Sequence, residues 1–240
     1  MKKFLFSAAN STVAKEQLNL PATKDKIRHA FPHENSCYQY EWIDDVTVPL
    51  LSDAFRSPTQ TIVAFQFSGH GSAKQLSFMR PAAWHNQKIN ARSLAEFFGL
   101  QPSLTLVVFD SCNSVGLARA CIDAGVPIAI GTNHSLQDAA SLVFNQYFWG
   151  GIVAGRSISH AFEEAKQLYI TENNRFLDQP SWELIVNPNK PDAAEHAWDF
   201  EDCRQQPQQM NHQQSIMNVQ NTKVAINEVK GDFTFNESDT

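Results

Sequence analysis

The sequence predicts an α/β protein in which a mostly parallel central sheet carries helices on both faces. Short apolar runs, rich in β-branched and aromatic residues and bounded by turn residues, alternate along the chain with stretches of helical spacing. Continuous apolar runs are typical of strands that are buried on both faces, as in parallel sheets. Because parallel strands need long crossover connections, the alternation of strands and helices indicates a three-layer α/β/α sandwich.

The predicted strands are runs that are apolar throughout or alternate between apolar and polar residues, and each ends at small or polar residues. In chain order they cover residues 2–9, 38–42, 61–67, 104–109, 127–131 and 182–186, with a short hairpin arm at 75–79. The helices expected between them cover residues 24–31, 46–55, 91–98, 115–123, 138–149 and 157–169, and Ser157 is placed to cap the last helix.

Length and composition limit the classes of protein that the chain can form. Its 240 residues, 42% of them hydrophobic, suffice for one large domain with an appendage. The formal charge is −6, from 19 basic and 25 acidic residues without a cluster of Lys or Arg, which argues against nucleic-acid binding. No run approaches the roughly 20 apolar residues of a membrane span. The sequence also lacks a G-x-G-x-x-G motif and a phosphate loop, so we expect no nucleotide or other cofactor.

The cysteines and histidines bear on the compartment and on metal binding. The chain has four cysteines: Cys37, Cys112, Cys121 and Cys203. No two of them form a Cys-x-x-Cys pair. The apolar stretch at the N-terminus is shorter than the roughly 7 to 15 residues of a signal peptide, so we expect a reducing, cytoplasmic location. The histidines that would join His70 in a metal site have spacings that match no zinc signature: His85, His134 and His160. We therefore expect no metal.

Two short segments carry most of the chemical information. Ser68-Gly69-His70-Gly71 follows the strand predicted at 61–67, and Asp110-Ser111-Cys112-Asn113-Ser114 follows the strand predicted at 104–109. In open α/β sheets the crevice for ligands lies outside the carboxyl ends of the strands. We therefore expect a His and a Cys to stand together at that edge of the sheet.

A His beside a Cys is the arrangement of a cysteine hydrolase. The nucleophile is the thiolate, whereas a free thiol with a pKa of about 8.5 is mostly protonated at neutral pH. A nearby His takes the thiol proton and returns it to the leaving amine. The alternative is an inert buried Cys with a structural His. That alternative fits Cys37 and Cys121, but it fits Cys112 less well, because Cys112 stands in a turn of small residues at a strand end.

The same residues resemble the two catalytic motifs of the caspase-like cysteine peptidases. They are most similar to those of the CHAT domains, a group related to separases, caspases and metacaspases. Residues 3–10 resemble the opening strand of bacterial CHAT domains, and the resemblance continues at residues 125–132, 138–144 and 155–165. It implies a caspase-like three-layer fold for most of the chain.

The resemblance also implies chemical roles, residue by residue. Cys112 corresponds to the nucleophile and His70 to the general base and acid, a dyad that needs no third catalytic residue. The backbone amides of Gly71 and Cys112 correspond to the oxyanion hole. The resemblance therefore implies a cysteine endopeptidase that hydrolyses a protein or peptide substrate, as an effector or activator in a bacterial defence or cell-death pathway.

Two acidic residues are candidates for substrate specificity. In metacaspases, which share the Asp-Ser-Cys pattern, the acidic residue at the position of Asp110 helps to bind a basic side chain of the substrate. A buried carboxylate is stabilised by a cation, so Asp110 predicts cleavage after Arg or Lys. Asp138 is the second candidate, and the alternative for Asp138 is a cap at the N-terminus of a helix.

The composition changes near Pro188 and divides the chain. We expect a peptidase domain at residues 1–188, a polar Gln-rich linker at 189–215 and a short β-type tail at 216–240. The tail either recruits a partner effector or is removed by self-cleavage, for which Arg204 is an accessible basic site, or it is a disordered terminus. The alternative to an enzyme is a catalytically inactive CHAT adaptor that binds partners through this tail. An acyltransferase or another thiol hydrolase would use the same dyad.

Overall fold

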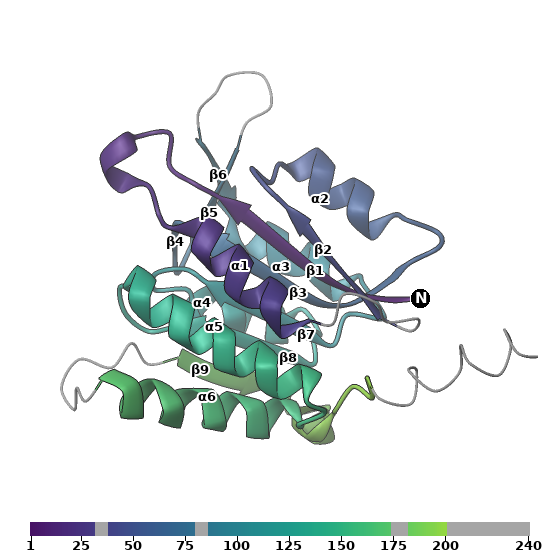
Figure 1. The fold of residues 1–240 in the computed structure, drawn as a ribbon. Coiled ribbons are helices and arrows are strands. Elements are labelled where there is room, and N and C mark those ends of the chain that lie inside the picture. The colour runs from purple at the N-terminus through teal and green to yellow at the C-terminus, as the bar shows by residue number, and fades with distance from the viewer. Residues whose placement is uncertain (32–37, 80–85, 174–181, 201–240) are drawn as a thin grey trace, which may run out of the picture. The chain divides into compact units, whose positions relative to one another are not determined.

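The computed structural model describes residues 1–31, 38–79, 86–173 and 182–200 (Figure 1). The chain divides after Phe200 into two units, Met1–Phe200 and Glu201–Thr240, and only the first is described here. The predictions for Arg204, for the tail at 216–240 and for most of the linker at 189–215 therefore lie outside the described residues. Cys37, Cys203 and His85 lie outside them as well.

Six strands form the central sheet, in the order β2-β1-β3-β7-β8-β9. Their bounds are β1 (Lys2–Ala9), β2 (Tyr38–Ile43), β3 (Thr61–Gly69), β7 (Leu106–Asp110), β8 (Ile128–Thr132) and β9 (Trp182–Val186). β9 runs antiparallel to β8, and the other neighbouring strands are parallel, so the mostly parallel sheet is confirmed. The inner strands are buried along nearly their whole length, as their continuous apolar sequences require.

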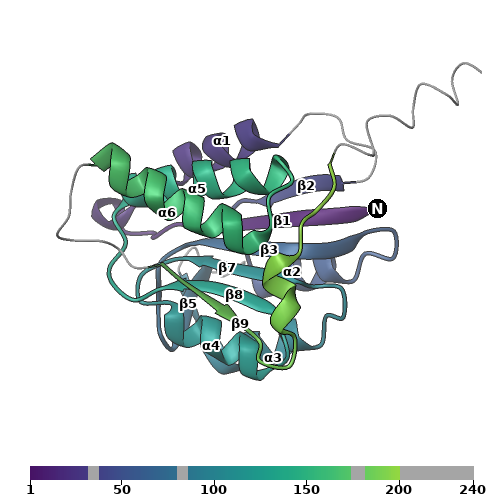
Figure 2. The same ribbon diagram turned by 90° about the horizontal axis from the view of Figure 1, so that it is seen from below.

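Helices cover both faces of this sheet, so the three-layer architecture is confirmed (Figure 2). One face carries α1 (Leu20–Ala30), α5 (Asp138–Val153) and α6 (Ile158–Asn173). The other face carries α2 (Val48–Phe55), α3 (Ala91–Gly99) and α4 (Val115–Asp123), packed over a single apolar cluster that includes Phe65 and Phe98. Beneath α5 the core is aromatic, with the rings of Phe6 and Trp149 4.9 Å apart. No helix among the described residues is both long and apolar enough to cross a membrane.

A second, three-stranded sheet begins directly after His70. It consists of β4 (Gly71–Ser72), β5 (Gln75–Met79) and β6 (Asn86–Asn90). β5 is the predicted hairpin arm. β6 is not predicted from the sequence, because its residues are mostly polar, and it is a strand through its antiparallel pairing with β5. The Ser77 N–H of β5 donates to the His70 carbonyl oxygen at 3.0 Å, so this sheet fixes the backbone at His70.

The described domain continues past the boundary expected at residue 188. After β9 and the 3-10 helix η2 (Pro191–Glu195), Trp198 and Phe200 are buried. The ring of Phe200 lies 4.7 Å from that of Tyr38 on β2, centroid to centroid. Two isolated aromatic residues in a polar segment make no periodic pattern, so the sequence gives no sign that this segment packs on the core.

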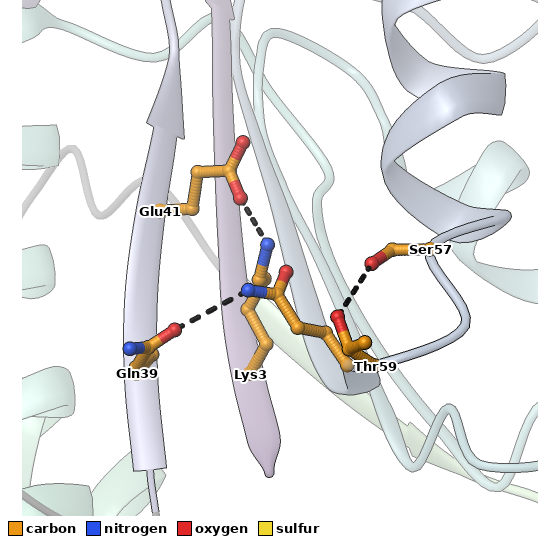
Figure 3. Close-up of polar contacts among 6 residues, drawn as sticks. Lys3, Gln39, Glu41, Ser57 and Thr59 are labelled. Atoms are coloured by element: carbon orange, nitrogen blue, oxygen red, sulfur yellow. Dashed lines mark hydrogen bonds and ion pairs between the residues drawn. The ribbon is translucent and has the colours of Figure 1, made fainter.

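Polar contacts join β2 to β1 and to the residue before β3 toward the amino-terminal edge of the sheet (Figure 3). Lys3 on β1 is buried, and its ammonium pairs with the carboxylate of Glu41 on β2. Next to this pair, Gln60 Nε2 donates to Gln39 Oε1 at 3.4 Å. A buried Lys is tolerated when it is paired, so Lys3 needs no functional explanation. These contacts lie at the opposite end of the strands from His70 and Cys112.

Candidate active site

The two chemically informative segments leave neighbouring strands at the carboxyl edge of the sheet. β3 ends at Gly69 and β7 ends at Asp110, and the register pairs Ser68 with Asp110. Because the two strands are parallel and adjacent, the residues that follow them emerge at the same edge. The structure therefore places His70 and Cys112 where the ligand crevice of an open α/β sheet is expected.

A cavity of about 340 Å³ opens at this edge, and it falls in the range of roughly 300–1,000 Å³ that is typical of ligand pockets. Its wall brings together four of the residues singled out from the sequence: His70, Cys112, Asp110 and Asp138. Gly71 lines a neighbouring hollow of about 290 Å³, which also touches His70. His70 therefore lies between two recesses, with Cys112 in the first and Gly71 in the second.

The imidazole of His70 is fixed by a backbone carbonyl. Its Nε2 lies 2.6 Å from the carbonyl oxygen of Glu16, the last residue of the 3-10 helix η1 (Ala14–Glu16). A carbonyl oxygen only accepts hydrogen bonds, so Nε2 carries the proton and Nδ1 of a neutral imidazole is an acceptor. Sequence reasoning misses Glu16, because every residue type offers the same carbonyl.

Polar side chains hold the loop that carries Glu16. Asn10 Oδ1 accepts a hydrogen bond from the Leu18 N–H at 2.8 Å, and Asn10 Nδ2 donates to the Leu18 carbonyl oxygen at 2.9 Å. At the end of the loop, the Asn19 N–H donates to Asp138 Oδ2 at 2.9 Å. Asp138 is the first residue of α5, where a negative charge also interacts favourably with the helix dipole. Asp138 therefore lines the cavity and anchors the loop that forms part of its wall.

Cys112 lies in a turn between β7 and α4 whose backbone is held from several sides. The buried Ser114 Oγ donates to the Ser111 carbonyl oxygen at 2.8 Å, and Thr132 Oγ1 donates to the same oxygen at 2.6 Å. Cys112 Sγ accepts a hydrogen bond from the Leu136 N–H at 3.2 Å. These bonds fix a half-buried thiol at the wall of the cavity.

Gly71 is required by close packing against the turn that carries Cys112. A Cβ at this position would lie 2.7 Å from Ser111 Oγ and 2.8 Å from Leu76 Cδ2, which is too close for a side chain. The missing side chain therefore lets the backbone of β4 approach the turn. The Gly71 backbone thus lies beside the side chain of the residue that precedes Cys112, as an oxyanion hole formed by the Gly71 and Cys112 amides needs.

Asp110 lines the cavity but is otherwise buried, with 6% of its surface exposed. Its Oδ2 accepts hydrogen bonds from Ser68 Oγ at 3.0 Å, Ser141 Oγ at 2.7 Å and Asn145 Nδ2 at 2.9 Å. Its Oδ1 is buried and has no hydrogen-bond partner among the described residues. Burial raises the pKa of Asp110; the three hydrogen bonds oppose this rise, and the charge of Asp138 adds to it.

Three solved structures that are similar to this chain are cysteine proteases. The chain is similar to the Arg-specific cysteine proteinase gingipain R, with a TM-score of 0.51 and 12% identity over 78% of this chain and 46% of that chain. It is similar to a secreted C11 cysteine protease from Bacteroides thetaiotaomicron, with a TM-score of 0.53 and 11% identity over 77% of this chain and 66% of that one. The Drosophila initiator caspase Dronc also matches, with a TM-score of 0.53 and 8% identity over 78% of this chain and 80% of Dronc.

These similarities define the class of the fold, which is the caspase-like α/β/α sandwich. The matched region is less than half of the gingipain R chain and just under two thirds of the C11 protease chain. The CHAT domain family matches residues 23–212, well over half of the sequence. The chain belongs to the CHAT domain family, so the family resemblance is confirmed. A search of curated proteins gives no match.

Proposed function

We propose that the chain is a cysteine endopeptidase in which Cys112 is the nucleophile and His70 is the general base and acid. The observation that carries the proposal is that the half-buried thiol and the imidazole line one cavity at the carboxyl ends of adjacent parallel strands. The contact between His70 Nε2 and the Glu16 carbonyl supports it, because this contact fixes the tautomer that base catalysis at Nδ1 requires.

The proposed reaction passes one proton between the dyad and the substrate. His70 takes the Cys112 thiol proton at Nδ1, and the thiolate attacks the carbonyl carbon of the scissile peptide bond. The backbone amides of Gly71 and Cys112 donate to the oxyanion that forms. The imidazolium then protonates the leaving amine, while the Glu16 carbonyl stabilises its charge through Nε2. Water hydrolyses the acyl-enzyme by the same proton path and restores the thiol.

The residue before the scissile bond is proposed to be Arg or Lys. Asp110 and Asp138 both line the cavity, whereas no Lys or Arg of the described chain does so. Asp110 Oδ1 is buried without a hydrogen-bond donor, and a substrate cation supplies one. Such a cation also favours the ionised carboxyl, against the effect of burial, which raises the pKa of Asp110.

The biological role proposed is that of a cytoplasmic effector or activator in a bacterial defence or cell-death pathway. Membership of the CHAT domain family is the argument for this role. In the same proposal, the tail at 216–240 recruits a partner effector or is removed by self-cleavage after Arg204. The fixed geometry around His70 and Cys112 favours an enzyme over an inactive adaptor, because binding through the tail needs neither residue.

Peptide libraries incubated with wild-type protein and with Cys112→Ala and His70→Ala test the proposed peptidase. We expect each variant to lose at least about 10³-fold in kcat/KM, as when one member of a catalytic unit is removed. Cys121→Ala is the matched control, because that thiol is buried in the core away from the cavity and burial raises its pKa. Turnover by Cys112→Ala equal to that of wild type would falsify the proposal. Intact mass spectrometry of the same samples tests self-cleavage after Arg204.

A further inference from the structure

The two oxygens of the Asp110 carboxyl group differ in their hydrogen bonding. Oδ2 accepts three hydrogen bonds, from Ser68, Ser141 and Asn145. Oδ1 is buried, and none of the described residues donates to it. Asp110 and Ser141 both line the cavity, and Oδ1 is the carboxyl oxygen that has no donor from the protein.

The donors that hold Oδ2 are themselves fixed by a buried polar network. Gln66 Nε2 donates to Ser68 Oγ and to Asn145 Oδ1, each at 2.9 Å. Trp149 Nε1 in turn donates to Gln66 Oε1 at 2.6 Å. Because Ser68 Oγ accepts from Gln66, its own hydrogen is directed to Asp110. Turning the carboxyl group would leave several of these buried groups unpaired, which is costly, so Oδ2 stays committed to the protein.

Arginine and lysine differ in what they need from a carboxylate. A guanidinium pairs best side-on, with one N–H donating to each of the two carboxylate oxygens. An ammonium is a compact charge, and a single oxygen is enough to pair with it. We infer that Asp110, with Oδ1 alone available, makes the cavity selective for Lys over Arg at the residue before the scissile bond. This inference rests on the proposed function, and it makes Ser141 and Asn145 positioning residues for Asp110.

Asp138 adds negative charge to the cavity without favouring either cation. Its side chain is partly exposed, and its Oδ2 already accepts the Asn19 N–H. One of its two oxygens is thus already used by the protein, as at Asp110, and its charge attracts an ammonium and a guanidinium alike. Three acidic residues line the cavity, Glu16, Asp110 and Asp138, and the discrimination between Lys and Arg is assigned to Asp110 because it is the buried one.

Two fluorogenic peptides that differ only in Lys or Arg before the fluorophore test the inference. We expect kcat/KM for the Lys peptide to exceed that for the Arg peptide by at least about tenfold, because Arg forgoes one charge-assisted hydrogen bond. In Ser141→Ala, Oδ2 loses a donor at the cavity wall and gains room to accept from Arg, so the Lys-to-Arg ratio falls severalfold. Partial unfolding lowers both rates alike and leaves this ratio unchanged. Ser93→Ala, at an exposed position of α3, is the matched control and keeps the wild-type ratio.

The outcomes separate the inference from the proposed function. An Arg peptide cleaved as fast as the Lys peptide, or faster, overturns the inference and leaves the peptidase intact. Cleavage that depends on Cys112 but occurs only after other residue types overturns both the inference and the basic specificity. Absence of any cleavage that depends on Cys112 overturns the proposed function together with the inference. A wild-type ratio in Ser141→Ala overturns the positioning role of Ser141.

Discussion

Nε2 of His70 and the carbonyl oxygen of Glu16 lie 2.6 Å apart, so the backbone of a loop completes the environment of the candidate base. His70 follows β3 and the loop follows β1, and these two strands are neighbours in the sheet. Because the acceptor is a main-chain atom, the contact depends on the position of the loop and not on the side chain of Glu16. Asn10 holds the loop in this position through its hydrogen bonds to Leu18, and Asp138 anchors the end of the loop at Asn19.

Replacing Asn10 by Ala is therefore expected to impair the proposed catalysis. The loop loses its hydrogen bonds to the Asn10 side chain, and a displacement of about 1 Å at a catalytic group costs on the order of 100-fold in rate. We expect kcat for a basic peptide to fall between about 10- and 100-fold, with a smaller change in KM. Thr12→Ala alters an exposed side chain of the same loop and is expected to keep wild-type kcat. Equal kcat values for the two variants would show that the loop does not position His70.

Gly71→Ala is expected to lower kcat strongly through the close contact with Ser111. The new Cβ would lie 2.7 Å from Ser111 Oγ and 3.0 Å from Ser111 Cβ, so the Ser111 side chain or the backbone of β4 has to shift beside Cys112. Displacing an oxyanion donor costs about 10²- to 10³-fold in kcat, and we expect a loss of that size. Gly150→Ala on α5 is the matched control, because a Cβ there meets nothing within 4 Å. Steady-state kinetics of both variants test this prediction. Full activity of Gly71→Ala would contradict it.

Thr132→Val tests how far the turn around Cys112 depends on a buried hydroxyl. Thr132 is fully buried, and its Oγ1 donates to the Ser111 carbonyl oxygen at 2.6 Å. Valine keeps the shape but leaves that oxygen with one donor fewer, so we expect unfolding free energy to fall by about 1–3 kcal/mol. We also expect kcat to fall, because the same bond holds the residue that precedes Cys112. Urea unfolding measures the effect on stability, and steady-state kinetics measure the effect on kcat. Thr132→Ser keeps the hydroxyl and should retain most of the wild-type stability and kcat. No difference between the Val and Ser variants would argue against the role of this bond.

Much of the fold and part of the candidate site follow from the sequence. The apolar runs before His70 and Cys112 mark β3 and β7, and the turn residues after them mark the edge where a ligand binds. The sheet order that makes β3 and β7 neighbours does not follow from local patterns, because β4, β5, β6 and α3 lie between them in the chain. His70 and Cys112 therefore come close together because of the order of the strands in the sheet, which local sequence patterns do not show.

The surroundings of Asp110 were open to prediction in one respect. Gln66 and Ser68 alternate with Phe65 and Phe67 in a strand expected to be buried on both faces, and buried polar side chains need partners. That pattern signals a buried polar network, although it does not identify Asp110 as the acceptor. The partners Ser141 and Asn145 come from α5, and their contact with Asp110 depends on how this helix packs on the sheet.

Asp110→Asn is expected to stabilise the fold at neutral pH while it abolishes cleavage after basic residues. Burial raises the pKa of Asp110 in the folded protein above the 3.8 of an exposed carboxyl, so the folded state holds this proton more tightly than the unfolded chain. This tighter binding of the proton stabilises the fold. The stabilisation is fully present below pH 3.8 and is lost as the pH rises through the folded-state pKa. Asparagine carries no charge at any pH, so the stability of the variant does not suffer this loss.

Thermal unfolding between about pH 4 and about pH 8 therefore distinguishes the variant from wild type. We expect the two melting temperatures to lie close together at the acid end and to separate as the pH rises, with the variant higher by about 2–4 °C for each kcal/mol gained. Asp123→Asn, at an exposed position of α4, controls for the loss of a surface charge. A difference that stays constant over this range would mean that Asp110 does not become charged within the fold. The carboxylate that the proposed specificity needs would then have to form only when a substrate cation enters the cavity.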